Sequence, residues 1–95
     1  MTRSRFTVVH GQRFESRLAM LWLQDRHVQK VIDELEPVLR TIPDQAGELF
    51  HFEGTEYWHL AHQSYELIYQ ILADDCQVRL IDVRPIPSRG VSERA

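Results

Sequence analysis

The spacing of apolar residues changes twice along this chain and divides it into predicted elements. The run SRFTVVH carries Phe6, Val8 and Val9 and predicts a strand that ends at Gly11. Apolar residues then recur at steps of three and four, which is the stripe of an amphipathic helix. The members of this stripe are Phe14, Leu18, Leu21 and Trp22, followed by Val28, Val31, Ile32, Leu35, Leu39 and Ile42.

Polar residues divide the helical stretch in two. The segment QDRH places Asp25 where the stripe needs an apolar residue. We therefore predict one helix from about Gln12 to Gln24 and a second helix from Asp25, whose carboxylate can serve as the N-cap. Pro37 lacks the N–H of the helix ladder and predicts a kink or a restart, and Pro43 predicts the end of the helix.

The last part of the chain alternates between apolar and polar residues. ELFHF is either part of a loop or a short strand, and EYWHLAH predicts a strand. The next two strands, YELIYQIL and a run from Val78 to Arg84, are joined by a predicted two-residue turn at Asp74-Asp75. The register that keeps the apolar residues on one face pairs Ile71 with Val78, Tyr69 with Leu80, Tyr65 with Arg84, Gln70 with Arg79 and Ile68 with Ile81.

This order of elements predicts an α+β fold. An N-terminal strand, a helical hairpin and a three-stranded antiparallel meander form one sheet, with the helices on one face. The other face is expected to be open and available as a working surface. A length of 95 residues suits one domain over residues 1–95, with an irregular tail at 86–95.

Composition and charge narrow the class of protein. A single cysteine, Cys76, excludes an internal disulfide, and no apolar run reaches the ~18–20 residues of a membrane span. The N-terminal segment lacks a hydrophobic signal core, so we expect a cytoplasmic protein without a membrane partner. The net charge is −3, and ten of the eleven cations are arginine. Acidic residues fill the middle of the chain and arginines both ends, so the ends either form a basic face or contribute to a mixed-sign surface.

Three segments together resemble the RelE/ParE superfamily of bacterial toxins from toxin–antitoxin pairs. They are FTVVH, VQKVIDELEPVLRTIP and YWHLAHQSYELIYQILADDCQVRLIDVRP. The family often shows an aromatic residue, an arginine, an apolar pair with tyrosine, an acidic turn and an apolar strand that ends near a basic residue. The corresponding positions here are Tyr65, Glu66, Leu67-Ile68-Tyr69, Asp74-Asp75 and Val78 to Arg84.

The resemblance implies a toxin that inhibits growth and is neutralised by a cognate antitoxin. RelE-like members cut mRNA on the ribosome with side chains of the concave sheet face, and ParE-like members act on DNA gyrase. Glu66 stands where the ribonuclease pattern has an arginine, and a carboxylate there repels the scissile phosphate. Pro85 and Ile86 offer no proton where ribonuclease members carry histidine or tyrosine. The ParE-like mode is therefore slightly favoured, with the RelE-like endoribonuclease and an inactive, protein-binding relative as alternatives.

The candidate site residues each have a structural alternative. Arg79 and Arg84 are expected on opposite sides of the last strand, where Arg84 either binds phosphate or an acidic partner or pairs with Tyr65 or Glu66. His59 and His62 can transfer protons but are expected on opposite faces of their strand. Glu66 is either a general base or a solvated carboxylate.

The predicted contacts with a target are made by Arg84, Arg79, Tyr65 and Arg89. Aromatic residues such as Tyr57 can stack on bases or pack in the core. No cofactor is indicated, and three or four convergent metal ligands are not evident.

Overall fold

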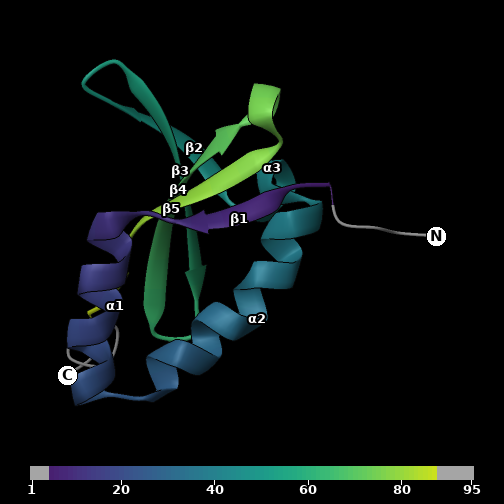
Figure 1. Ribbon diagram of the computed structural model, residues 1–95. Coiled ribbons are helices and arrows are strands. Elements are labelled where there is room, and N and C mark those ends of the chain that lie inside the picture. The colour runs from purple at the N-terminus through teal and green to yellow at the C-terminus, as the bar shows by residue number, and fades with distance from the viewer. Residues whose placement is uncertain (1–4, 88–95) are drawn as a thin grey trace, which may run out of the picture.

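The computed structural model describes residues 5–87, and within them one five-stranded sheet packs against two long helices (Figure 1). The predicted tail at 86–95 lies outside the described residues except for Ile86 and Pro87, which follow the last strand. The elements in chain order are β1 (Thr7–His10), α1 (Gln12–Gln24), α2 (His27–Thr41), α3 (Pro43–Ala46), β2 (Glu48–Phe52), β3 (Thr55–His62), β4 (Tyr65–Leu72), the 3₁₀ turn η1 (Ala73–Asp75) and β5 (Gln77–Pro85).

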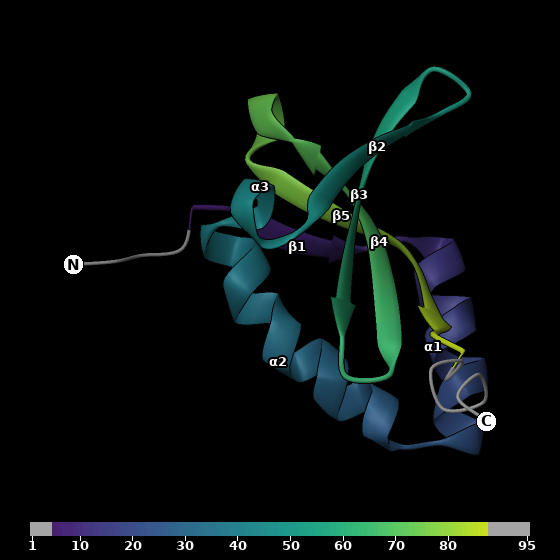
Figure 2. The same cartoon turned by 180° about the vertical axis from the view of Figure 1, so that it is seen from behind.

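The sheet has the order β1-β5-β4-β3-β2. Strands β2 to β5 form an antiparallel meander, and β1 pairs in parallel with β5 at the other edge. The meander has four strands rather than the predicted three, because ELFHF forms β2. The hairpin of β2 and β3 extends away from the rest of the sheet at one end (Figures 1 and 2).

The two helices cover one face of the sheet, as the apolar stripe predicts. They form a V that is closed at the junction of α1 and α2 (Figure 1). Phe14, Val28 and Leu39 are fully buried against Leu67, Tyr69 and other side chains of β4 and β5. The alternation of β4 is also confirmed, since Tyr65, Leu67 and Tyr69 belong to this core. One face of the sheet therefore packs against the helices, and its other face remains open.

The break between the helices is confirmed, but α2 begins at His27 with Arg26 rather than Asp25 at its N-cap position. The effect predicted for Pro37 is partly wrong. The Oδ1 atom of Asp25 accepts a hydrogen bond from the N–H of His27 at 3.0 Å, which satisfies a free donor at the start of α2. Helix α2 continues through Pro37 to Thr41 without a restart. The five apolar residues that α2 buries hold the helix together across the missing hydrogen bond. Pro43 follows the end of α2 and begins the short helix α3.

A β-bulge in β5 changes the predicted register. Tyr69 pairs with Leu80 and Ile71 with Val78, as predicted, but the register shifts between Ile68 and Tyr69. Ile68 then pairs with Asp82 rather than Ile81, and Tyr65 pairs with Pro85 rather than Arg84. The bulge places one extra residue, Ile81, in β5. The turn before β5 is also longer than predicted, since Ala73 to Cys76 connect Leu72 to Gln77, with Cys76 in a left-handed conformation.

Candidate functional site

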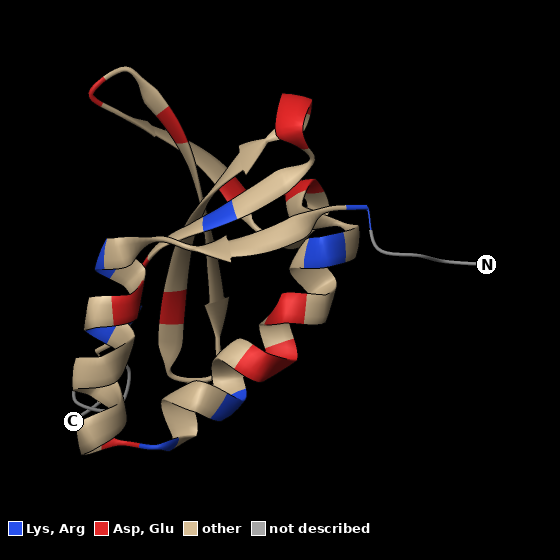
Figure 3. Ribbon diagram, viewed as in Figure 1, with Lys and Arg blue, Asp and Glu red and all other residues tan. Residues whose placement is uncertain are grey.

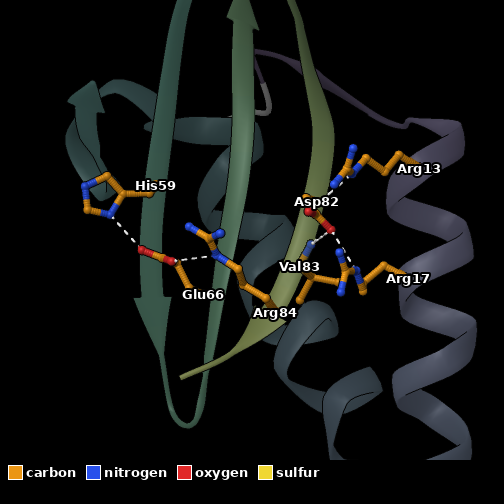
Figure 4. A network of polar contacts seen from close by, with 7 residues as sticks. All are labelled: Arg13, Arg17, His59, Glu66, Asp82, Val83 and Arg84. Carbon is orange, nitrogen blue, oxygen red and sulfur yellow. Dashed lines mark hydrogen bonds and ion pairs between the residues drawn. The ribbon is translucent and has the colours of Figure 1, made fainter. Parts of the chain in front are cut away.

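Three polar side chains from adjacent strands meet on the open face of the sheet. His59 lies on β3, Glu66 on β4 and Arg84 on β5. Glu66 pairs with Arg84 in the register, and His59 pairs with Ile68, two positions along β4 from Glu66. Because side chains alternate between the faces of a strand, all three point away from the helices. Figure 4 shows them in a row, with Glu66 in the middle.

The contacts of Glu66 hold the other two side chains. Its Oε2 atom lies 3.1 Å from Nδ1 of His59, and its Oε1 atom accepts a hydrogen bond from Nε of Arg84 at 3.1 Å. An ionised carboxylate only accepts hydrogen bonds, so Nδ1 of His59 carries the proton. In a neutral imidazole the Nε2 atom is then the acceptor, which is the form that a general base needs. The nearest carboxylate to Nε2 is the 84% exposed Glu48, at 3.6 Å.

The row is accessible to a ligand. The exposed fractions of the side chains are 34% for His59, 24% for Glu66 and 55% for Arg84. Glu66 is the least exposed of the three, and its side chain is held in place by its contacts with His59 and Arg84. For Arg84, the sequence left open whether it binds a phosphate or an acidic partner, or pairs with Tyr65 or Glu66. The structure contains the cross-strand pair with Glu66.

A second polar cluster lies on the same face, between β5 and α1. Asp82 is 9% exposed, and its Oδ1 atom accepts a hydrogen bond from the N–H of Val83 at 2.9 Å. The Nε atom of Arg13 lies 3.4 Å from one carboxylate oxygen of Asp82, and that of Arg17 lies 3.3 Å from the other. Arg13 and Arg17 occupy successive turns of α1 and reach Asp82 together (Figure 4).

A groove of about 430 Å³ joins the two clusters. Arg13 and Asp82 line one part of it, and Arg84 lines the part nearer Glu66. Aromatic and aliphatic side chains form the rest of the wall: Phe50, Phe52, Tyr57, Ile68 and Ile81. A hollow of about 220 Å³ adjoins it and includes His59 and Glu66. The open face thus combines guanidinium groups, a histidine–carboxylate pair and aromatic rings.

Other predicted site residues lie elsewhere. His62 faces the helices, where its Nε2 atom lies 2.8 Å from Oε1 of Glu34, so the prediction that His59 and His62 lie on opposite faces is confirmed. Tyr65 is 5% exposed, and its hydroxyl donates to Oδ2 of Asp25 at 2.9 Å. The side chain is enclosed between the sheet and the helix junction, and this burial argues against its predicted role in target binding.

The prediction for Arg79 and Arg84 also changes. Arg79 pairs with Gln70 and Arg84 with Glu66, and these partners lie on the same face of β4. The two arginines therefore share the open face rather than opposite sides of β5. The bulge causes this change, since the extra residue reverses the alternation after position 81. Arg89 lies outside the described residues.

Polar groups on the helix side have shifted pKa values that reflect packing. The pKa of Asp25 is lowered by the backbone N–H of His27 and by the hydroxyl of Tyr65. The pKa of Glu34 is lowered by its hydrogen bond with His62. Burial, followed by the contact with Asp25, raises the pKa of Tyr65. These groups attach the helices to the sheet.

Sequence reasoning missed Asp82 and Phe50 as members of the site. Asp82 follows an apolar pair in β5, and its place on the open face depends on the bulge. Phe50 lies in the segment for which strand and loop were both open, although its stacking on Tyr57 follows once that segment pairs with β3. The basic residues near the start of the chain were noted, and the structure brings Arg13 and Arg17 beside β5. The resulting surface has mixed charges, because Asp82 and Glu66 accompany the arginines. Figure 3 shows that acidic and basic positions are interspersed along the helices and the sheet.

Neither a metal-binding cluster nor a membrane-spanning helix is found among the described residues. Within residues 5–87, no group of three or more His, Cys, Asp or Glu side chains is placed to hold a metal ion. In the same range, no helix combines the length and the apolar character that crossing a membrane requires.

Comparison with solved structures identifies the fold. A chain of the toxin–antitoxin complex RelBE2 from Mycobacterium tuberculosis superimposes with a TM-score of 0.75 at 18% sequence identity, over 85% of this chain and 98% of that chain. The chain has a RelE-like fold. A chain of the archaeal RelE–RelB complex from Pyrococcus horikoshii is similar with a TM-score of 0.54 at 19% identity, over 88% of this chain and 98% of that chain. The RelE-like fold is thus shared where the sequences have diverged widely.

No family model matches the sequence, and no curated protein matches it. The RelE-like fold confirms the predicted α+β architecture with helices on one face of the sheet. It also places the His59–Glu66–Arg84 row on the sheet face that the helices leave open.

Proposed function

We propose that this chain is the toxin of a toxin–antitoxin pair and that it inhibits growth by cleaving mRNA on the ribosome. The observation that carries the proposal is the contact of His59 and Arg84 with Glu66 on the open face. Both similar structures, the toxin–antitoxin complex RelBE2 and an archaeal RelE–RelB complex, support the same class. The sequence slightly favoured a ParE-like mode because ribonuclease side chains are missing at the usual positions, whereas the contacts of the row support the RelE-like alternative.

The row has the groups that cleavage next to a ribose requires. Nε2 of His59 takes the proton of the 2′-hydroxyl, and the 2′-oxygen attacks the adjacent phosphorus. The bond from phosphorus to the 5′-oxygen breaks, which leaves a 2′,3′-cyclic phosphate, and the leaving oxygen takes a proton from water or from the imidazolium. Arg84 stabilises the negative charge that grows on the phosphoryl oxygens. Glu66 is a positioning residue, because it orients His59 and Arg84 without contacting the substrate.

The aromatic side chains of the groove suit an unpaired RNA strand. Phe50 stacks on Tyr57 with 5.6 Å between ring centroids, and Phe52 is 58% exposed beyond them. Bases of a single strand stack on exposed aromatic rings, which contributes about 1–3 kcal/mol per base. The proposed strand lies across β2 and β3 with its backbone directed toward the arginines.

The cognate partner follows from the same surface. An antitoxin that covers the open face excludes RNA from His59 and Arg84 at once. Co-expression with the short neighbouring reading frame is expected to restore growth and to yield a stable complex. A growth defect that persists in the presence of every adjacent frame contradicts the partner proposal.

A gyrase-directed mode is the second candidate, and one observation favours it. Glu66 engages Arg84 and places a negative charge where a phosphate needs a positive one. The decisive experiment is induction in a host, followed by 5′-end mapping of mRNA and by analysis of plasmid DNA. Cuts in phase with codons support cleavage on the ribosome. Intact mRNA together with broken supercoiled DNA overturns that proposal in favour of gyrase.

A further inference from the structure

The cluster around Asp82 has no part in the proposed chemistry, although it lies on the same open face, between β5 and α1. Asp82 lines the groove between Arg13 and Arg84. Ionised carboxylates are rarely this enclosed unless other groups neutralise them. The two guanidinium groups of α1 and the N–H of Val83 do so here. The cluster is thus an anion site that the chain's own carboxylate occupies.

The bulge is what puts the carboxylate there. Leu80 pairs with Tyr69, and Asp82 already pairs with Ile68, so Ile81 and Asp82 both lie on the open face. With regular pairing, position 82 belongs to the face that packs on the helices. The fold therefore delivers a carboxylate to Arg13, which lines the groove, and to Arg17 on the next turn of α1.

The arginines keep most of their hydrogen-bonding capacity. Arg13, Arg17 and Arg84 each engage a carboxylate through Nε, at 3.4, 3.3 and 3.1 Å. A guanidinium has five N–H donors, and four of them are on the Nη atoms. These donors suit the oxygens of a phosphodiester. Arg13 is 71% exposed and can turn toward a ligand without opening the core.

We propose that Arg13 and Arg17 form a second phosphate site and that Asp82 attenuates it. The ligand is the backbone of single-stranded RNA next to the bond at Arg84, so the inference rests on the proposed function and adds a means of regulating its site. Asp82 and the phosphodiester each carry one negative charge and compete for the same guanidinium groups. The affinity for RNA is therefore lower than it would be if Arg13, Arg17 and Arg84 had no carboxylate beside them.

Removal of the charge at Asp82 tests the inference. Asp82→Asn keeps the shape and the acceptor for the Val83 N–H. A 2′-O-methyl RNA 12-mer, which cannot be cleaved by 2′-hydroxyl attack, serves as the probe in fluorescence anisotropy at several salt concentrations. We expect at least about threefold tighter binding at low salt and a salt dependence steeper by about 0.7 for each phosphate gained.

The matched control is Asp33→Asn, which removes the same charge from the exposed side of α2, away from the groove. Its carboxylate accepts a hydrogen bond from Gln29 at 2.9 Å, and the amide can still accept it. Unchanged binding by this variant shows that the gain does not come from net charge. Equal gains in the two variants overturn the inference, as does unchanged or weaker binding by a folded Asp82→Asn.

Arg13→Gln keeps the inference testable if Asp82→Asn does not fold. We expect at least about threefold weaker binding and a shallower salt dependence, since one phosphate contact is lost. Unchanged binding overturns the inference. Because the probe is not cleaved, these results are independent of the mRNA mapping. If mRNA is not cut but Asp82→Asn binds the RNA probe more tightly, only the ribonuclease proposal is contradicted. If mRNA is cut but Asp82→Asn does not bind the probe more tightly, only the phosphate site is contradicted.

Discussion

At the scale of single residues, His59 and His62 lie on the same strand but on opposite faces of the sheet, so we expect them to have different roles. His59 contacts Glu66 on the open face, and His62 contacts Glu34 on the helix side. A base must reach the substrate, whereas a residue between sheet and helix contributes to packing. The first prediction follows from this separation.

We expect His59→Ala to reduce cleavage by about 10²–10⁴-fold, since general base catalysis contributes this much. Added imidazole is expected to restore part of the rate, because the vacated position is partly open to solvent. The measurement is cleavage of programmed ribosomes with and without imidazole. His62→Ala is the matched control from the same strand. A rate unchanged in His59→Ala, or lost equally in His62→Ala, contradicts the role of His59.

Tyr69 gives a second prediction, which concerns stability and pH. Its hydroxyl donates to the carbonyl of Pro43 at 2.7 Å, and burial raises its pKa to about 12. The folded state therefore favours the protonated phenol over the phenolate. The stability from this group is complete below the ordinary pKa of 10 and is lost as the pH rises toward 12.

The measurement is the free energy of unfolding in urea between pH 8 and higher pH, for the wild type and for Tyr69→Phe. We expect the difference between them to shrink, and then to change sign, as the pH approaches the pKa of Tyr69. The difference removes contributions from other groups that titrate in this range. A difference that stays constant with pH shows that the phenol is not held in its protonated form.

At the scale of elements, the connection from α3 to β2 depends on a position with no room for a side chain. A Cβ atom on Gly47 would lie 2.6 Å from the carbonyl oxygen of His59 and would also meet the hydroxyl of Tyr69. The φ angle of Gly47 is −114°, which other residues adopt readily, so the restriction is steric. The glycine sets how closely this connection approaches β3 and β4.

We expect Gly47→Ala to lower the free energy of unfolding by about 1–3 kcal/mol, as overpacked sites do. Removal of the Tyr69 hydroxyl in Gly47→Ala/Tyr69→Phe relieves one of the two clashes. The double variant is therefore expected to lose less than the sum of the single losses. Urea unfolding of the four proteins completes the cycle. Strict additivity would show that the two positions do not interfere.

The elements also show how far the sequence specifies this fold. Helix α1 has the predicted bounds because its stripe is regular and Asp25 interrupts it. The register near the turn is right because Ile71, Val78, Tyr69 and Leu80 can share a face in one alignment only. The bulge was not predictable from alternation, since Ile81 fits either face as an apolar residue beside Asp82. The Asp82 carboxylate that it turns to the open face contacts Arg13 and Arg17 of α1, far away in the chain, and local alternation does not reveal such contacts.

For the candidate site too, local patterns were predictable and contacts between distant parts of the chain were not. His59 and Glu66 were candidates from residue type, and strand alternation separated His59 from His62. The face of Tyr65 was predicted correctly, but its burial was not, because it lies at the start of β4, where the junction of α1 and α2 covers it. Its contact with Asp25 joins residues 40 positions apart, which local pattern does not reveal.

At the scale of the whole molecule, the two faces of the sheet carry different sets of polar contacts. Contacts such as Tyr65–Asp25 and His62–Glu34 lie on the helix side, and the polar row lies on the other side. Substitutions are therefore expected to affect stability or activity according to their face.

We expect Tyr65→Phe to lower the free energy of unfolding by about 1 kcal/mol through the lost hydrogen bond to Asp25. Cleavage per folded molecule is expected to remain unchanged, since Tyr65 does not reach the groove. Thermal melting and single-turnover cleavage measure the two quantities. Glu66→Gln provides the comparison from the other face, with reduced cleavage and a small effect on melting. Loss of cleavage in Tyr65→Phe at full folding would show that the faces are coupled.

The position of β5 has a consequence for synthesis of the protein. This strand lies between β1 and β4 in the sheet, yet it is the last of the described elements in chain order. Until it emerges from the translating ribosome, β1 has no neighbour and the row lacks its guanidinium. If the proposed function holds, a nascent chain lacks the complete row until β5 has emerged, so RNA cleavage becomes possible only after that point. The proposed antitoxin would then have an assembled open face to bind only after β5 has joined the sheet.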